Sequence, residues 1–177
     1  MSKVYTAHAD GRFAIGARKV RCALGKGGVI EAADKREGDG CTPLGLWPMR
    51  KLLYRADRGP KPVTRLPMAA IGRNDGWCDH PGDANYNRPV KLPYPVSAEK
   101  MWRDDELYDL VVVLGYNDAP VRSGRGSAIF LHCARPKFTP TAGCVAIAKP
   151  ELRALLAKLG PGDAVAVTDS VSLAGMD

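Results

Sequence analysis

Two residues in the second half of the chain have the types needed for nucleophilic catalysis, His132 and Cys144. A cysteine attacks a carbonyl as the thiolate, and a nearby imidazole can hold it in that form. Gly143 directly precedes the cysteine and allows a tight turn, which would aim the amides of Gly143 and Cys144 at a developing oxyanion. The sequence therefore predicts acyl transfer, with Cys144, His132 and Gly143 as catalytic residues.

Two short apolar segments must position this pair. Residues 128–131 and 145–147 have the composition of strands, so His132 ends the first strand and Cys144 precedes the second. Pro136 and Pro140 lie in the loop between them and exclude a continuous helix. Two strands joined by such a loop can bring their facing ends within side-chain reach.

The chain has five cysteines, an odd number, which in an oxidising compartment would leave one reactive thiol. Cys133 follows His132 directly, so on a strand it points to the opposite face, which favours Cys144 as the nucleophile. Cys22 lies on an apolar strand face and is expected in the core. Cys41 and Cys78 border glycine-rich turns and are the favoured partners of a disulfide, if one exists.

The segment that begins at His132 resembles the signature of the L,D-transpeptidases, the YkuD-like family. There a histidine is followed, after a gap, by Ser/Thr-His-Gly-Cys, an apolar residue, and Arg or Asn. Residues 141–146 are Thr-Ala-Gly-Cys-Val-Ala, and residues 42–45, Thr-Pro-Leu-Gly, are similar to an upstream element of the same family. Ala142 and Ala146 depart from the pattern, so the nucleophile and base carry over while the outer substrate contacts do not. A divergent branch is implied.

The resemblance implies a substrate and a mechanism. Family members crosslink bacterial peptidoglycan through a cysteine acyl-enzyme. Cys144 would attack a donor stem peptide, while His132, oriented by a backbone carbonyl, would protonate the leaving amine and deprotonate the acceptor amine. The donor is usually cut after meso-diaminopimelate at stem position three. One proteobacterial branch instead forms an L-Ala(1)-mDAP(3) crosslink, and the missing second histidine and a proline-rich insertion make it a candidate. The implied partners are stem peptides and glycan strands, with no cofactor.

Four further residues are expected to contact the substrate. Arg135 lies three residues after His132 and could bind a substrate carboxylate, or be a plain surface arginine. Thr141 belongs to the motif itself. Tyr116 could contact the substrate or the oxyanion, or could cap the edge of the sheet. Trp77, with neighbouring aromatic residues, could stack on sugars or peptides.

Residues 59–97 form an unusual segment that holds seven prolines among Gly, Asn and Asp. Few backbone ladders survive that density, which predicts an ordered irregular insertion rather than a second domain. The insertion would be either a surface loop stiffened by proline or a wall over the active site. Cys78, Asp79 and His80 within it match no reliable zinc spacing, so no metal site is predicted.

The remaining pattern predicts a single domain over residues 1–177 that is mainly β with one or two helices (α+β), an L,D-transpeptidase-like β-sheet or sandwich. A helix is predicted between Pro150 and Gly160, where four leucines recur at helical spacing. Residues 171–177 are expected to be a loose tail. The other strands are predicted at residues 4–8, 12–15, 19–24, 47–54, 107–116 and 164–167.

The net charge of +7 is carried by residues 1–65, which hold 14 Lys and Arg against 6 Asp and Glu. This basic region could attract nucleic acid or a carboxylate-rich polymer, or only aid solubility. No nucleic-acid motif accompanies it, so no nucleic-acid partner is predicted. No run approaches the roughly 20 apolar residues of a membrane span. The first residues lack the features of a secretory signal, although the family implies a periplasmic location; a monomer is expected.

Two other functions are compatible with these residues. If water replaces the acceptor amine, the same site is a thiol carboxypeptidase or endopeptidase that trims peptidoglycan stems. Alternatively, the protein is a non-enzymatic binder of acidic polymers that uses residues 1–65. That function would survive Cys144→Ala and would be lost on charge reversal at Arg18 and Lys19.

Overall fold

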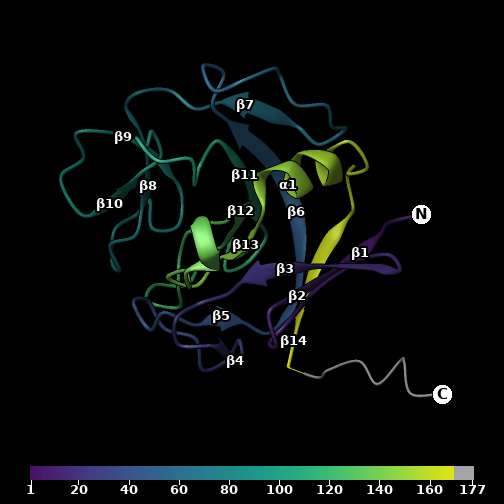
Figure 1. Cartoon of the computed structure of the whole chain (residues 1–177). Helices are drawn as coiled ribbons and strands as arrows, with labels where there is room; N and C mark the ends of the chain where they lie inside the picture. Colours follow the sequence, from purple (N-terminus) through teal and green to yellow (C-terminus); the bar gives the residue numbers. More distant parts are fainter. Residues whose placement is uncertain (170–177) are drawn as a thin grey trace.

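The computed structural model describes residues 1–169, and its longest strand, β6 (Gly45–Tyr54), belongs to two sheets at once. The first half of β6 pairs with β14 (Ala164–Thr168) and the second half with β11 (Leu110–Leu114). On the other side, β3 (Arg18–Ala23) pairs first with β2 (Arg12–Ile15) and then with β13 (Val145–Ile147). Because both strands cross from one sheet to the other, the two sheets close into a sandwich (Figure 1).

The first sheet runs in the order β3-β2-β1-β14-β6, and the second runs β11-β12-β13-β3 with β6 alongside β11. Parallel pairs occur at β1 with β14 and at β12 with β13, while most other neighbours are antiparallel. The prediction of a mainly β protein is confirmed. The remaining elements of the sandwich and its edges are β1 (Val4–His8), β4 (Val29–Ile30), β5 (Thr42–Pro43), β7 (Met68–Ala70), β12 (Phe130–Cys133) and a 3-10 turn η1 (Pro136–Phe138).

The main hydrophobic core lies between the two sheets. Leu52, Leu131 and Val165 meet there from three different strands, and all three are fully buried. The helix α1 (Lys149–Leu156) packs against β11 and β12 and adds its leucines to this core, as its spacing predicts. The helix ends earlier than expected, although Leu159 beyond it is still buried. The tail expected at residues 171–177 lies outside the described residues.

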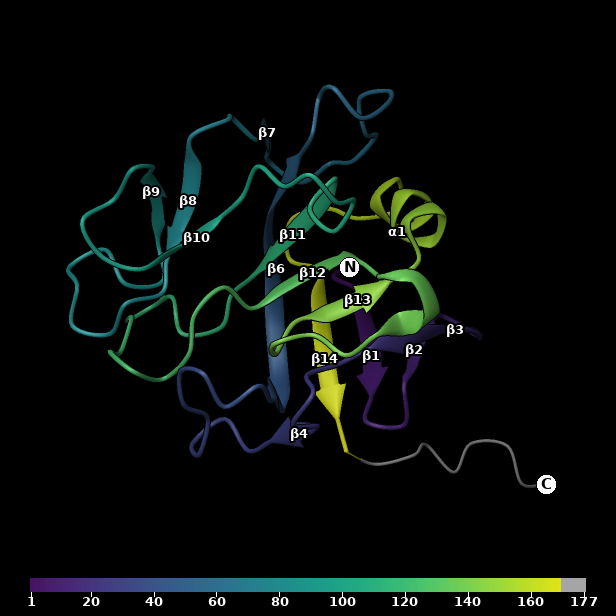
Figure 2. The same ribbon diagram turned by 60° about the vertical axis from the view of Figure 1, so that its left-hand side comes forward.

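The proline-rich insertion differs from its prediction. Three antiparallel strands, β8 (Asp75–Cys78), β9 (Pro89–Lys91) and β10 (Ala98–Lys100), form a separate small sheet, here called the insertion sheet. Pro89 is the first residue of the edge strand β9, and the other prolines lie outside these strands, so none interrupts a ladder. Figure 2 shows the insertion sheet beside β11 and β12.

A second hydrophobic cluster joins the insertion to the outer face of the second main sheet. Trp77 of β8 and Met101 after β10 pack there with Val111, Val113 and Phe130. The Trp77 and Phe130 rings meet edge to face with centroids 5.0 Å apart. The insertion is therefore packed on the sheet rather than projecting as a surface loop.

Candidate active site

The pairing of β12 with β13 places Cys144 and His132 on one face of the sheet. The strands are parallel, and His132 lies opposite Ala146. Side chains alternate along a strand, so Cys144, two residues before Ala146, faces the same side as His132. Cys133 and Val145 face the opposite side and lie in the main core. The nucleophile–base pair expected from the sequence therefore shares one face, the outer face that the insertion covers.

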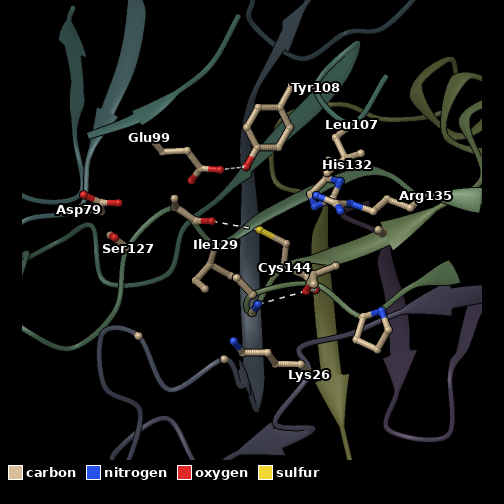
Figure 3. A pocket seen from close by; sticks show the side chains of 18 of the residues that line it. Lys26, Asp79, Glu99, Leu107, Tyr108, Ser127, Ile129, His132, Arg135 and Cys144 are labelled. Atoms are coloured by element: carbon tan, nitrogen blue, oxygen red, sulfur yellow. Dashed lines mark hydrogen bonds between the residues drawn. The ribbon is translucent and has the colours of Figure 1, made fainter. Parts of the chain in front are cut away.

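A cavity of about 560 Å³ lies over this face and is lined by both Cys144 and His132 (Figure 3). Its walls come from segments far apart in the sequence, which brings basic and acidic side chains together around the sulfur. They include Lys26, Lys35 and Glu37 from the first third of the chain, Asp79, Glu99, Arg103 and Tyr108 from residues 55–109, and Arg135 with residues 139–143.

The Cys144 thiol is neutral in the resting protein. Its Sγ donates a hydrogen bond to the carbonyl of Ala128 at 3.1 Å and accepts one from the amide of Phe130 at 3.4 Å. Burial, reinforced by the negative charge of Glu99, raises the pKa of Cys144 to about 12. Burial and the hydrogen bond to Ala128 thus favour the protonated thiol, whereas the sequence predicts a thiolate held by the imidazole.

His132 is held in the tautomer that suits a general base. Its Nδ1 lies 2.8 Å from the carbonyl oxygen of Cys133, which can only accept, so Nδ1 carries the proton and Nε2 keeps its lone pair. A backbone carbonyl orients the ring, as predicted. Burial lowers the pKa of His132 to about 4, so the imidazole is neutral at physiological pH. The edge of the ring packs against Tyr108, with centroids 5.4 Å apart.

The turn before the nucleophile is fixed by Thr141. Its hydroxyl donates to the carbonyl of Cys144 at 2.7 Å and accepts from the amide of Gly143 at 3.1 Å. Gly143 has a φ of 140°, and a Cβ there would lie 2.9 Å from the carbonyl oxygen of Cys41. The Gly143 amide is thus engaged by Thr141. Within residues 1–169, the Cys144 amide has no such partner, so it is free to donate a hydrogen bond to a ligand in the cavity.

The other residues expected at the substrate lie in different places. Arg135 is exposed and lines the cavity beside His132. Trp77 does not line this cavity: it is buried, and its Nε1 donates to Asn87 Oδ1 at 2.9 Å. Tyr116 is also buried away from the cavity, edge to face with Trp47, and its hydroxyl donates to the carbonyl of Arg125. Neither ring is therefore accessible for stacking on a substrate.

Sequence reasoning missed the acidic side of the cavity. Glu99 on β10 accepts a hydrogen bond from the Tyr108 hydroxyl, and burial raises the pKa of its carboxyl. Asp79, at the end of β8, has an Oδ1 that is buried and has no hydrogen-bond partner within residues 1–169. From the sequence, Asp79 suggests only a metal ligand beside Cys78 and His80. Nothing in the sequence pattern around Glu99 distinguishes it from a surface residue.

Asn87 connects the insertion to the nucleophile through Ala128. The Asn87 side chain donates to the carbonyls of Tyr116 and Asn117 and accepts from Trp77 and from the amide of Ala128. Ala128 has a φ of 53°, a conformation uncommon for a residue with a Cβ. Its carbonyl is the acceptor of the Cys144 thiol. The backbone that holds the thiol is thus itself held by a fully hydrogen-bonded amide.

All five cysteines are free, so the Cys41–Cys78 disulfide considered from the sequence does not form in this structure. The Cys41 sulfur contacts the carbonyl of Gly27 at 3.4 Å, whereas Cys78 is buried on the insertion sheet. Cys22 and Cys133 lie in the main core, and burial raises the pKa of each to about 12. Among residues 1–169, no three His, Cys, Asp or Glu side chains are grouped so that they could bind a metal.

Comparison with known proteins agrees with the geometry of this site. Within residues 1–169, no helix has the length and apolar character needed to cross a bilayer. No curated protein matches the chain. The family model for the L,D-transpeptidase catalytic domain, YkuD, matches residues 3–167, nearly the whole chain. The enzymes of this family act on peptidoglycan, and the chain belongs to it.

Proposed function

We propose that this protein is a peptidoglycan L,D-transpeptidase that forms an acyl-enzyme on Cys144. The observation that carries the proposal is the shared face of Cys144 and His132: a thiol and a base-competent imidazole open into one cavity. The protein is proposed to act in the periplasm as a monomer on stem peptides and glycan strands.

In the first step the carbonyl of a donor stem peptide lies over the Cys144 sulfur. Nε2 of His132 takes the thiol proton as sulfur attacks, and the amide of Cys144 donates to the developing oxyanion. The imidazolium then protonates the departing amine, which leaves a thioester and a neutral His132. Because both groups begin neutral and buried, charge develops only while the substrate fills the cavity.

In the second step an acceptor amine attacks the thioester, and the sulfur leaves with the proton that His132 returns to it. Arg135, exposed beside His132, is positioned to bind a carboxylate of the stem peptide, since guanidinium and carboxylate pair in a fixed geometry. The insertion contributes Asp79 and Glu99 to the lining of the cavity. Because Ala142 replaces the second histidine of the family pattern and the insertion borders the cavity, the L-Ala(1)-mDAP(3) crosslink is the product to look for first.

The test is incubation with purified muropeptides, followed by separation and mass analysis of the products. We expect crosslinked dimers, and intact-mass measurement should show an acyl adduct on Cys144 that is absent from Cys144→Ala. Cys41→Ser is the matched control, because Cys41 is also a free thiol but does not line the cavity. Trimmed monomers without dimers would identify a carboxypeptidase or endopeptidase instead. The absence of any adduct would overturn the proposal.

A further inference from the structure

Glu99 is a carboxylate inside the catalytic cavity that the mechanism above does not use. It comes from the insertion sheet, and Figure 3 shows Glu99 and His132 on opposite sides of the Cys144 sulfur. The Tyr108 hydroxyl fixes it by a hydrogen bond. Its negative charge acts on Cys144, since it contributes to the raised pKa of the thiol. Glu99 therefore lies near the atom at which acyl transfer takes place.

The negative charge on this side of the cavity has no matching cation. Within residues 1–169, no basic side chain lies within ion-pair distance of Glu99; the nearby Arg103 is bound to both carboxylate oxygens of Asp105. Asp79 lines the same cavity with a buried oxygen that lacks a hydrogen-bond donor. Buried acidic oxygens are costly unless donors reach them. The side of the cavity formed by Glu99 and Asp79 is therefore complementary to a cationic donor such as an ammonium group.

The proposed reaction needs such a group to lose a proton. A primary amine reaches the enzyme at neutral pH as an ammonium, which has no lone pair for attack on the thioester. His132 is a weak base for this task, because burial lowers its pKa to about 4. Burial has the opposite effect on the carboxyl of Glu99, whose pKa it raises.

We propose that Glu99, held by Tyr108, binds the ammonium group of the acceptor on the insertion side of Cys144 and accepts its first proton. This inference rests on the proposed transpeptidase function and names the acceptor as a charged primary amine. Asp79 supplies a second acceptor for the same ammonium.

The protons and bonds balance as follows. The ammonium transfers one proton to the Glu99 carboxylate, and the resulting amine nitrogen bonds to the thioester carbon. His132 takes the second proton from that nitrogen, the C–S bond breaks, and the imidazolium returns the proton to the Cys144 sulfur. The products are the new amide, the free thiol and a protonated Glu99, which releases its proton to water.

The test compares two acceptors on the preformed acyl-enzyme of Glu99→Gln. Meso-diaminopimelate carries ammonium groups at pH 7, whereas hydroxylamine is largely uncharged and needs no prior deprotonation. We expect Glu99→Gln to acylate at least as fast as the unmodified protein by intact mass, because the charge that adds to the effect of burial on the pKa of Cys144 is gone. Aminolysis of its acyl-enzyme by diaminopimelate should fall about 100-fold, the scale of general-base catalysis. Its aminolysis by hydroxylamine should change less than about threefold, because that nucleophile bypasses the proposed base.

Two further variants complete the experiment. Tyr108→Phe keeps the ring against His132 but removes the hydroxyl that holds Glu99, so it should show the same selective loss in weaker form. Glu106→Gln is the matched control, because Glu106 is an exposed carboxylate paired with Lys149 outside the cavity, and it should behave as the unmodified protein.

The outcomes separate the two proposals. If the unmodified protein forms no acyl-enzyme, the transpeptidase function fails, and the assignment of Glu99 fails with it. If acylation proceeds but Glu99→Gln slows both acceptors equally, or neither, the transpeptidase function stands and the role of Glu99 is wrong. If Tyr108→Phe slows aminolysis by both acceptors equally, the proposed role of Glu99 is also wrong.

Discussion

The sulfur of Cys144 and the imidazole of His132 line the same cavity, where burial opposes charge on either group. The thiol donates to a backbone carbonyl and the imidazole donates to another, so each group has a neutral partner in the resting protein. Burial and the Glu99 carboxylate raise the pKa of Cys144, and they outweigh the Phe130 amide and the charge of Lys35, which favour the thiolate. In the proposed mechanism His132 therefore takes the thiol proton only as the sulfur attacks.

The pH profile of acylation tests this interpretation. His132 is a competent base only while neutral, and its pKa is lowered from 6.5 to about 4. We expect the rate of acyl-enzyme formation to be nearly constant from about pH 5 to pH 8 and to fall as the pH drops toward 4. Intact-mass kinetics with a donor muropeptide provide the measurement. A midpoint near 6.5 would show an ordinary, solvated imidazole instead.

The same burial makes the stability of the protein depend on pH. The folded state binds the His132 proton more weakly than the unfolded state, so this stability is complete above pH 6.5 and is lost as the pH falls to about 4. The shift corresponds to about 3 kcal/mol at most. Urea unfolding gives the free energy of unfolding at pH 7 and at pH 5. The loss between these two pH values should be smaller for His132→Gln than for the unmodified protein. An equal loss in both would show that His132 is not the group responsible.

Among individual residues, Cys144 and His132 could be identified from the sequence, because both the family motif and the alternation of side chains along the strands indicate them. The role of the Gly143 amide could not be derived, since its engagement by Thr141 depends on the conformation of the turn. Glu99 and Asp79 could not be recognised either. They reach the cavity only because β8 and β10 pair and pack on the sheet, which local sequence does not encode.

Among the secondary-structure elements, the strands of the sandwich could be predicted from the sequence pattern, but those of the insertion sheet could not. Strands of the sandwich alternate or are uniformly apolar, and segments such as β1, β2 and β13 begin and end where predicted. The insertion sheet was missed because the density of prolines was counted without regard to their positions between strands. The prediction for Trp77 rests on the stacking of sugars and peptides on aromatic rings, yet β8 places this ring in the second hydrophobic cluster.

Removal of the Asn87 side chain should break the hydrogen bonds that link Trp77 of the insertion to Ala128, the residue whose carbonyl holds the Cys144 thiol. Asn87→Ala loses four hydrogen bonds and leaves the amide of Ala128 and the Nε1 of Trp77 without an acceptor. We expect a loss of stability of about 2–4 kcal/mol, because buried groups are left unsatisfied. Acylation should also slow more than the folded fraction explains, as the Ala128 carbonyl no longer fixes the thiol.

Thermal unfolding and intact-mass kinetics on the same sample provide both values for this variant. Asn85→Ala is the control, since Asn85 lies in the same segment but bonds to Tyr94 at an exposed position. Acylation that slows only in proportion to unfolding would limit Asn87 to a stabilising role.

In the whole molecule, the main hydrophobic core and the candidate active site lie on opposite faces of the second sheet. The main core fills the space between the sheets, whereas Cys144 and His132 lie on the outer face of one of them. The prediction of a β-sandwich followed from the strand pattern and the family resemblance. The closure by β6 and β3 did not, because a strand that changes partners halfway has no signature in its own residues.

The basic first third of the chain gives a prediction about polymer binding. Its excess of Lys and Arg should attract the carboxylates of peptidoglycan, with a strength that falls as salt screens the charges. We expect Cys144→Ala to sediment with purified sacculi as well as the unmodified protein does, and to be released as salt is raised from about 0.05 to 0.5 M. Its crosslinking should be absent. Salt-independent binding would show that other contacts dominate.

The hydrogen bond from the Cys144 thiol to the Ala128 carbonyl bears on how such an enzyme survives between turnovers. Peroxides and disulfides react with thiolates, and a sulfur kept protonated offers them almost none. We therefore expect Cys144 to be oxidised more slowly than a thiol whose pKa is lowered by its surroundings. In the proposed mechanism the thiol reacts only when the cavity is occupied, so the proposed substrate, a stem peptide, also triggers the reaction.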